Sequence, residues 1–96
     1  RDNVSFPPIV ANARNSFFPH HFPLDKKIKK GILLIDCGAK YKGYCADLTR
    51  VFSIGRPSFK EKELYSTVFE AKELGESLSV AGTITSKAFE QVSRFL

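Results

Sequence analysis

The pattern of apolar and polar residues predicts a β-hairpin in the middle of the chain. Residues 32–36 (Ile-Leu-Leu-Ile-Asp) form an apolar run, and residues 44–52 read as a second strand. The turn between them includes Tyr41-Lys42-Gly43. The hairpin is therefore expected over about 31–54, ended by Gly55-Arg56-Pro57.

A shorter strand is expected ahead of the hairpin. Residues 6–11 are mostly apolar but include Pro7 and Pro8, which weaken the start of a strand because proline cannot donate to a ladder. Residues 13–30 read as a long loop. Phe17, Phe18 and Phe22 in this loop are expected to be buried on the core, with a role in lining a proline-accepting pocket as the alternative.

The second half of the chain has the periodicity of helices. Ser58 and Glu61 form a capping box, so a helix is expected over 59–78. Its apolar stripe predicts packing against a sheet and comprises Leu64, Val68, Ala71, Leu74 or Gly75, and Leu78. A second helix follows Ala81-Gly82-Thr83 and is expected to be capped by Thr83 or Thr85. Strands followed by helices indicate an α+β fold.

The hairpin register decides where two aspartates lie. If Lys40 pairs with Gly43 around a two-residue turn, Asp36 lies directly opposite Asp47, with the side-chain origins about 4.5–5.5 Å apart. Ionised carboxylates at that distance repel unless a proton, a cation or a metal intervenes. Paired carboxylates suit hard divalent metal ions. The alternative is an exposed hairpin with two solvated aspartates, and a bulge at Gly43 would also separate them.

Composition excludes some classes of partner. The 96 residues suffice for one small domain, with 43% hydrophobic and 26% charged residues and a net charge of +5. The cluster Lys26-Lys27-Ile28-Lys29-Lys30 lacks the aromatic interleaving of a nucleic-acid site, so it is read as a solvated loop. No stretch has transmembrane length and no signal peptide is visible. We therefore expect neither a nucleic-acid nor a membrane partner.

The two cysteines favour a reduced, cytoplasmic protein. In the register above, Cys37 and Cys45 lie on opposite faces of the hairpin, which excludes a disulfide between them. Each is expected to be a small buried apolar residue.

We expect the chain to be part of a longer protein, called the parent below. It contains no methionine. A helical apolar stripe also runs to the last residue, through Ala88, Phe89, Val92, Phe95 and Leu96. Residues 1–96 are thus expected to be a partial catalytic domain, truncated at both ends.

Several short motifs recur in order along nearly the whole chain. They are Pro8-Ile9-Val10-Ala11-Asn12, Asn15, Pro19-His20-His21-Phe22-Pro23, Lys30-Gly31, Ile35-Asp36-Cys37-Gly38, Gly43-Tyr44 and Asp47-Leu48-Thr49-Arg50. Together they resemble the proline-specific branch of the pita-bread metallopeptidases, which are the Xaa-Pro aminopeptidases and the Xaa-Pro dipeptidases (prolidases). Two departures are Ala13, where glycine is common, and Ala81, where proline is usual before Gly82.

The resemblance implies a pita-bread (creatinase/aminopeptidase) fold and a metal-activated water that hydrolyses Xaa-Pro bonds. Such enzymes hold two divalent ions, commonly manganese, with cobalt and zinc as alternatives. Asp36 matches the aspartate that chelates one ion, and Asp47 matches the one that bridges both. The remaining ligands, one His and two Glu, are implied beyond Leu96. The isolated chain is therefore expected to be inactive and to have an incomplete metal site.

The resemblance also implies roles for residues that are not ligands. His20 matches a histidine that hydrogen-bonds the substrate or the oxyanion as the amide is attacked, whereas His21 is read as a neighbour without a role. Thr49 shares the face of Asp47, where its hydroxyl can support the metal ligands. Arg50 points the other way and is read as structural.

Alternatives to this function remain. One is a non-catalytic pita-bread module that binds peptides or proteins, and another is a different branch such as methionine aminopeptidase. The absence of glycine after His20 and the sequence Leu48-Thr49-Arg50 favour the proline-specific branch. The expected partner is an Xaa-Pro peptide, and a homodimeric parent is left open.

Overall fold

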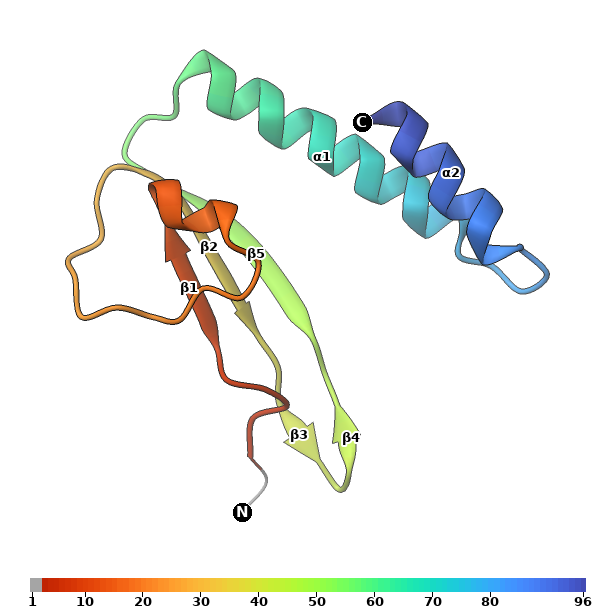
Figure 1. Ribbon diagram of the computed structural model, residues 1–96, viewed down its shortest axis with the longest axis horizontal. Helices are drawn as coiled ribbons and strands as arrows, with labels where there is room; N and C mark the ends of the chain where they lie inside the picture. The colour runs from red at the N-terminus through yellow and green to blue at the C-terminus, as the bar shows by residue number, and fades with distance from the viewer. Residues whose placement is uncertain (1–2) are drawn as a thin grey trace. The chain divides into compact units, whose positions relative to one another are not determined.

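The hairpin predicted from the sequence is the centre of a three-stranded antiparallel sheet in the computed structural model, which describes residues 3–96 (Figure 1). Strand β2 (Gly31–Cys37) pairs with β5 (Leu48–Ile54) on one side and with β1 (Ile9–Asn12) on the other. Beyond this sheet the hairpin continues as β3 (Lys40–Tyr41) and β4 (Tyr44–Cys45). The sheet therefore has the order β1-β2-β5.

The turn of the hairpin lies one residue later than predicted. Tyr41 pairs with Tyr44, so Lys42 and Gly43 are the two central residues, with φ angles of 48° and 86°. Two-residue turns with positive φ at both positions match the twist of the strands, and glycine meets this requirement best at the second position. The predicted pairing of Lys40 with Gly43 is wrong, because Lys40 pairs with Cys45.

The elements before the hairpin differ from the prediction in their limits. Strand β1 begins at Ile9, after both prolines, and extends to Asn12. The loop that follows opens with a 3-10 helix, η1 (Ala13–Phe17). Ala13 adopts a left-handed conformation with φ 52°, which turns the chain away from the direction of β1.

The first compact unit, residues 1–57, has a small core on this sheet. Ala11 in β1 and Leu33 in β2 are its buried apolar residues, 1% and 6% exposed. The expected burial of three phenylalanines is wrong: Phe17, Phe18 and Phe22 are 84%, 57% and 75% exposed. The loop therefore keeps its aromatic side chains on the surface.

The second compact unit, residues 58–96, is a pair of helices in contact with each other. Helix α1 (Phe59–Leu78) begins at the predicted residue, and its capping box is present: the Ser58 hydroxyl accepts from the Glu61 N–H, and Glu61 accepts from the Ser58 N–H. Helix α2 (Thr85–Phe95) packs against the second half of α1, where Ala71 is 4% exposed. A side chain at Gly75 would lie 3.6 Å from Val92.

Of two expectations for these helices, one is wrong and the other stays untested. The cap predicted for the second helix is wrong, because Ile84 occupies the N-cap position and no side chain caps it. Thr85 is instead the first residue inside the helix. On α1, Leu64 and Val68 are more than half exposed. The packing of the α1 stripe on a sheet stays a prediction.

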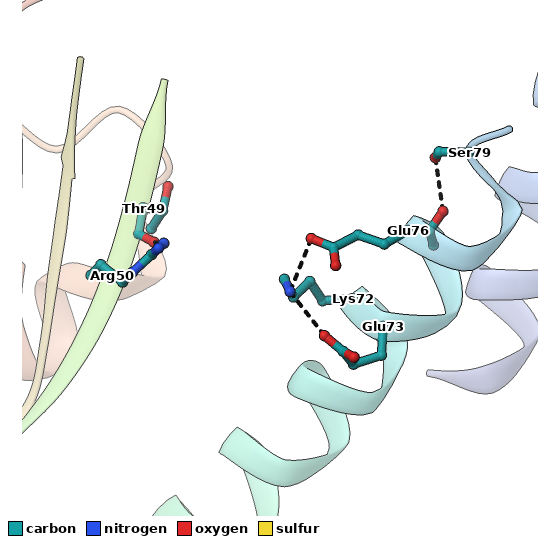
Figure 2. Close-up of polar contacts among 7 residues, drawn as sticks. Thr49, Arg50, Lys72, Glu73, Glu76 and Ser79 are labelled. Carbon is teal, nitrogen blue, oxygen red and sulfur yellow. Dashed lines mark hydrogen bonds and ion pairs between the residues drawn. The ribbon is translucent and has the colours of Figure 1, made fainter. Parts of the chain in front are cut away.

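An ion-pair cluster lies on the exposed surface of α1. The Lys72 ammonium is 2.9 Å from a carboxylate oxygen of Glu76 and 2.9 Å from one of Glu73 (Figure 2). The hydrogen bond to Glu76, followed by that to Glu73, raises the pKa of Lys72 above its ordinary value of 10.5. The Lys72–Glu76 pair, one turn apart, thus stabilises the helix locally.

The cysteines are unpaired, as predicted, but they are not buried. Cys37 and Cys45 are both free thiols on the exposed surface of the hairpin. The expectation that they are small core residues is wrong because the hairpin extends beyond the three-stranded sheet. Within residues 3–96, no helix is both long and apolar enough to cross a membrane.

Candidate metal centre

Asp36 lies near the end of β2, where the hairpin leaves the three-stranded sheet. Its partner in the ladder is Thr49 of β5, not Asp47. The Thr49 hydroxyl donates a hydrogen bond to Oδ1 of Asp36 at 2.9 Å. The Asp36 residue is half-buried. One carboxylate oxygen is thereby fixed, and Oδ2 has no protein partner within residues 3–96.

Asp47 lies in the short break between β4 and β5, and its position follows from the register. Cys37 pairs with Leu48 on one side of the break, and the Ala46 N–H donates to the Ala39 carbonyl at 2.8 Å on the other. One residue is left on each arm, Gly38 and Asp47. The aspartate therefore faces a glycine across the hairpin.

Gly38 permits a close approach of the two arms beside Asp47. A Cβ at this position would lie 1.8 Å from the Ala46 carbonyl oxygen and 3.0 Å from the Ser5 hydroxyl oxygen. No side chain fits there without a movement of the backbone. Gly38 belongs to the motif Ile35-Asp36-Cys37-Gly38 and was not predicted to have a role, although a glycine between two strands is itself a signal of close backbone approach.

The predicted direct pairing of Asp36 with Asp47 is thus wrong. The true partner of Asp36, Thr49, lies two residues further along the chain. A shift of two residues keeps each side chain on the same face of a regular hairpin, whereas a shift of one would reverse it. Asp47 precedes Thr49 by two positions, so a regular strand continued through the break would place it on the face of Thr49, diagonal to Asp36. Such neighbours are about 7–8 Å apart between backbones, within reach of a shared cation.

His20 lies in a turn of the loop after η1 and is exposed. No hydrogen bond or ion pair joins it to Asp36 or Asp47 in the part of the chain that the structure describes. His21 lines a hollow of about 300 Å³ together with Asn12 and several cationic residues of the loop. Thus the structure brings Asp36 and Thr49 into contact, and leaves His20 on a separate segment.

Arg50 points away from the aspartates, as predicted. It pairs with Ile35, one position along from the Asp36–Thr49 pair, and so belongs to the opposite face of the sheet. Its guanidinium donates to the Thr49 carbonyl at 2.8 Å, and both residues are drawn in Figure 2. This contact holds the Arg50 guanidinium against the backbone of its own strand, β5.

The donor set on this hairpin fits part of a divalent metal site. Carboxylate oxygens are the ligands that magnesium, calcium and manganese prefer. Residues 3–96 contain no group of three or more His, Cys, Asp or Glu side chains close enough to hold a metal ion together. Asp36 and Asp47 can therefore supply two carboxylates, and a complete site needs ligands from elsewhere.

Comparison with known proteins identifies the family. The model of metallopeptidase family M24 matches residues 1–96. This chain belongs to that family. An uncharacterized peptidase of Bacillus subtilis, YqhT, is 43% identical over 94 residues, which cover 97% of this chain and 26% of YqhT.

Solved structures of related enzymes match this M24 chain as well. A prolidase from Thermococcus sibiricus is 48% identical, with a TM-score of 0.76 over 82% of this chain and 22% of that protein. An X-Pro aminopeptidase from Thermotoga maritima is 41% identical, with a TM-score of 0.90 over 96% of this chain and 26% of that protein. The chain thus spans about a quarter of the length of these relatives. The α+β prediction is confirmed, and the strands and helices match part of pita-bread structures.

Proposed function

We propose that the parent of this M24 chain is an exopeptidase that hydrolyses Xaa-Pro bonds, and that residues 1–96 are part of its catalytic domain. Two similarities support the proposal: a prolidase and an X-Pro aminopeptidase are each more than 40% identical to this chain. The name of the second states that it acts on X-Pro peptides. The substrate class we propose is therefore an Xaa-Pro peptide.

Asp36 and Asp47 are the residues that we propose as metal ligands. Two divalent ions fit a site built from carboxylates, and manganese is the metal that we propose first. When bound, they supply an activated water and stabilise developing negative charge. One His and two Glu from the part of the parent beyond Leu96 complete the ligand set in this proposal.

Thr49 and His20 act beside the ligands. The Thr49 hydroxyl binds Oδ1 of Asp36 and so orients the carboxylate, and Oδ2 is available to a cation. We propose that the imidazole of His20 donates a hydrogen bond to the carbonyl oxygen of the scissile peptide. Such a donor stabilises the charge that develops on this oxygen as the bond is attacked.

The hydrogen bond between Thr49 and Asp36 is the observation that carries the assignment of the site. A solvated aspartate on an exposed hairpin needs no partner, and a half-buried one held by a hydroxyl is typical of an oriented ligand. The metal-free alternative, a peptide-binding module, has no comparable support here. It becomes the preferred function if the parent binds no manganese.

The isolated 96-residue chain is proposed to be inactive and to bind manganese weakly. Two carboxylates leave most coordination positions to water, and residues 3–96 hold no larger cluster of ligands. Manganese-dependent cleavage of an Xaa-Pro peptide by the chain alone would contradict this. So would tight, stoichiometric manganese binding measured by calorimetry.

The decisive experiment compares the parent with two aspartate variants. Manganese-dependent hydrolysis is measured on an Xaa-Pro dipeptide and an Xaa-Pro tripeptide. Asp47→Ala should abolish hydrolysis, whereas Asp25→Ala, an exposed aspartate of the loop, should leave it unchanged. The preferred peptide length distinguishes a dipeptidase from an aminopeptidase. A parent that cleaves neither peptide would overturn the proposal.

One further property of the parent is a prediction, and a second, its oligomeric state, is open to test. A cytoplasmic location is proposed because Cys37 and Cys45 are exposed free thiols, which persist in reducing compartments; cell fractionation checks it. A homodimeric state is checked by light scattering of the purified parent.

A further inference from the structure

Asn12, the last residue of β1, has the most hydrogen bonds of any polar side chain among residues 3–57. Its Nδ2 donates to the Lys29 carbonyl at 3.1 Å and to the Ile32 carbonyl at 2.9 Å. Its Oδ1 accepts from the Lys29 N–H at 2.7 Å. All three partners are backbone groups, so these contacts depend on the course of the main chain and not on the side chains of Lys29 and Ile32.

These contacts join the end of β1 to the chain just ahead of β2. A side-chain amide carries a carbonyl and N–H donors, as a peptide group does, so it can bind both backbone groups of another residue. Asn12 pairs through its own backbone position with Leu33, and its side chain reaches back to Lys29, two residues before β2 begins. The amide therefore binds both backbone groups of Lys29, which lies outside the sheet.

The segment that this amide closes is the one that carries His20. Residues 13–28 leave the sheet at Ala13 and return at Lys29. Their hydrogen bonds in the described structure stay within the segment, as in the Phe18 N–H to Asn15 carbonyl bond at 3.1 Å and the Ser16 hydroxyl to Ala13 carbonyl bond at 2.6 Å. The hydrogen bonds of Asn12 are thus the ones that tie the exit of the loop to its entry.

The same amide connects the loop to the strand of the proposed metal ligand. Ile32, whose carbonyl Asn12 binds, lies on β2, which also carries Asp36. Fixing both ends of a loop removes conformations that place its residues wrongly. The geometry between His20 on the loop and Asp36 on the sheet therefore depends on Asn12.

We propose that Asn12 is a positioning residue for His20 in Xaa-Pro hydrolysis. This inference rests on the proposed function, in which His20 acts on the substrate. Without the amide, the loop keeps its sequence and its local turns but loses its closure. His20 then samples positions from which it cannot reach the scissile carbonyl.

The test uses the parent enzyme with Asn12→Ala, His20→Ala and the double variant. Displacement of a catalytic group by about 1 Å costs up to about 100-fold in rate, so we expect Asn12→Ala to lower kcat about 10- to 100-fold. The KM and the manganese affinity should change little, because Asp36 and Asp47 are untouched. The double variant should be no slower than His20→Ala, because Asn12 acts through His20.

Two further variants separate the amide from its surroundings. Asn12→Asp keeps the shape and the acceptor oxygen but loses both N–H donors, so it should lower kcat as Asn12→Ala does. Lys29→Ala removes the side chain of the bound residue and leaves its backbone groups in place, so kcat should stay unchanged. Amide hydrogen exchange provides a readout independent of activity: in Asn12→Ala it should accelerate at Lys29 and across 13–28, with β2–β5 amides unaffected.

Three outcomes would overturn the inference. They are an unchanged kcat in Asn12→Ala, independent and multiplicative losses in the double variant, and unchanged exchange at Lys29. Each can be seen in a parent that cleaves Xaa-Pro peptides. A parent that cleaves none overturns the proposed function first and removes the catalytic role of Asn12 with it, which is a different result.

Discussion

Thr49 donates a hydrogen bond to Asp36 across the β2–β5 ladder, at 2.9 Å between Oγ1 and Oδ1. The two residues are direct partners in the sheet, so the contact is set by the backbone register and not by a flexible reach. One oxygen of the carboxylate is therefore held by β5. The hairpin thus presents an aspartate whose orientation is fixed before any cation binds.

Removing the Thr49 hydroxyl should weaken metal binding by the parent. Thr49→Val keeps a β-branched side chain that suits the strand and loses only the hydrogen bond. We expect manganese affinity, measured by titration calorimetry, to fall about 10-fold, the lower end of the usual effect of such supporting groups. Thr49→Ser retains the hydroxyl and should retain the affinity. Equal affinities in the Val and Ser variants would remove the supporting role of Thr49.

Gly38 and Gly43 should respond differently to substitution, although both lie in the hairpin. A methyl group at Gly38 meets the Ala46 carbonyl at 1.8 Å, so Gly38→Ala should destabilise by about 3 kcal/mol, the upper range for overpacking. Gly43 has open space around it but a φ of 86°, so Gly43→Ala should cost only about 1 kcal/mol. Urea unfolding of the parent measures both.

Asparagine provides the matched control for these glycines. It tolerates left-handed backbone better than alanine does, so Gly43→Asn should be milder than Gly43→Ala. At Gly38 the obstacle is space, and Gly38→Asn should be no milder than Gly38→Ala. The opposite order at either position would contradict the assigned cause.

Replacing Ala13 with glycine should stabilise the protein. Ala13 has a φ of 52°, which costs an L-residue about 1–2 kcal/mol, and glycine avoids this cost. Glycine also gives the unfolded chain more freedom, which offsets part of the gain. We expect a net increase of about 0.5–1 kcal/mol in the free energy of unfolding. Ala39→Gly, at a residue without positive φ, should destabilise instead.

The Lys72 cluster should stabilise α1 in a pH-dependent way. The pKa of Lys72 is raised by its hydrogen bonds to Glu76 and then Glu73, so the charged form is favoured in the folded state. The stabilisation is complete below the unfolded value of 10.5 and is lost as the pH rises through the higher folded value.

The measurement compares Lys72→Gln with the unsubstituted protein. The difference in melting temperature should be constant from neutral pH to about pH 10 and shrink above it. It should also shrink in about 1 M salt because the cluster is exposed. Lys60→Gln on the same helix is the control, because Lys60 makes no ion pair within residues 3–96. A Lys72 difference that persisted at the highest pH would show a cause other than charge.

Local signals predicted the fold better than they predicted the contacts. Ser58 and Glu61 are three residues apart, and their capping box depends on nothing beyond that spacing, so the start of α1 was predicted correctly. The hairpin register depends on a single turn. A two-residue turn with positive φ favours glycine at its second central position, which places Lys42 and Gly43 at the centre. That choice of turn predicts Thr49 as the partner of Asp36.

Burial was harder to predict because it depends on neighbours distant in sequence. Phe17 and Phe22 are of a residue type that is typical of cores, yet they lie on an exposed loop. Cys37 is exposed because it lies where the hairpin leaves the sheet. Asn12 was visible as part of a motif, yet its three partners could not be known without the return path of the chain to Lys29.

The single register that runs from the Lys42-Gly43 turn to the end of β5 constrains how this hairpin can change in length. An insertion of one residue in either arm between the turn and Asp36 or Thr49 would move one side chain of that pair to the opposite face. Substitutions on the outer surface of the arms have no such effect. Related sequences should therefore keep the number of residues between Asp36 and Thr49 constant even where the residue types on the outer surface of the arms differ.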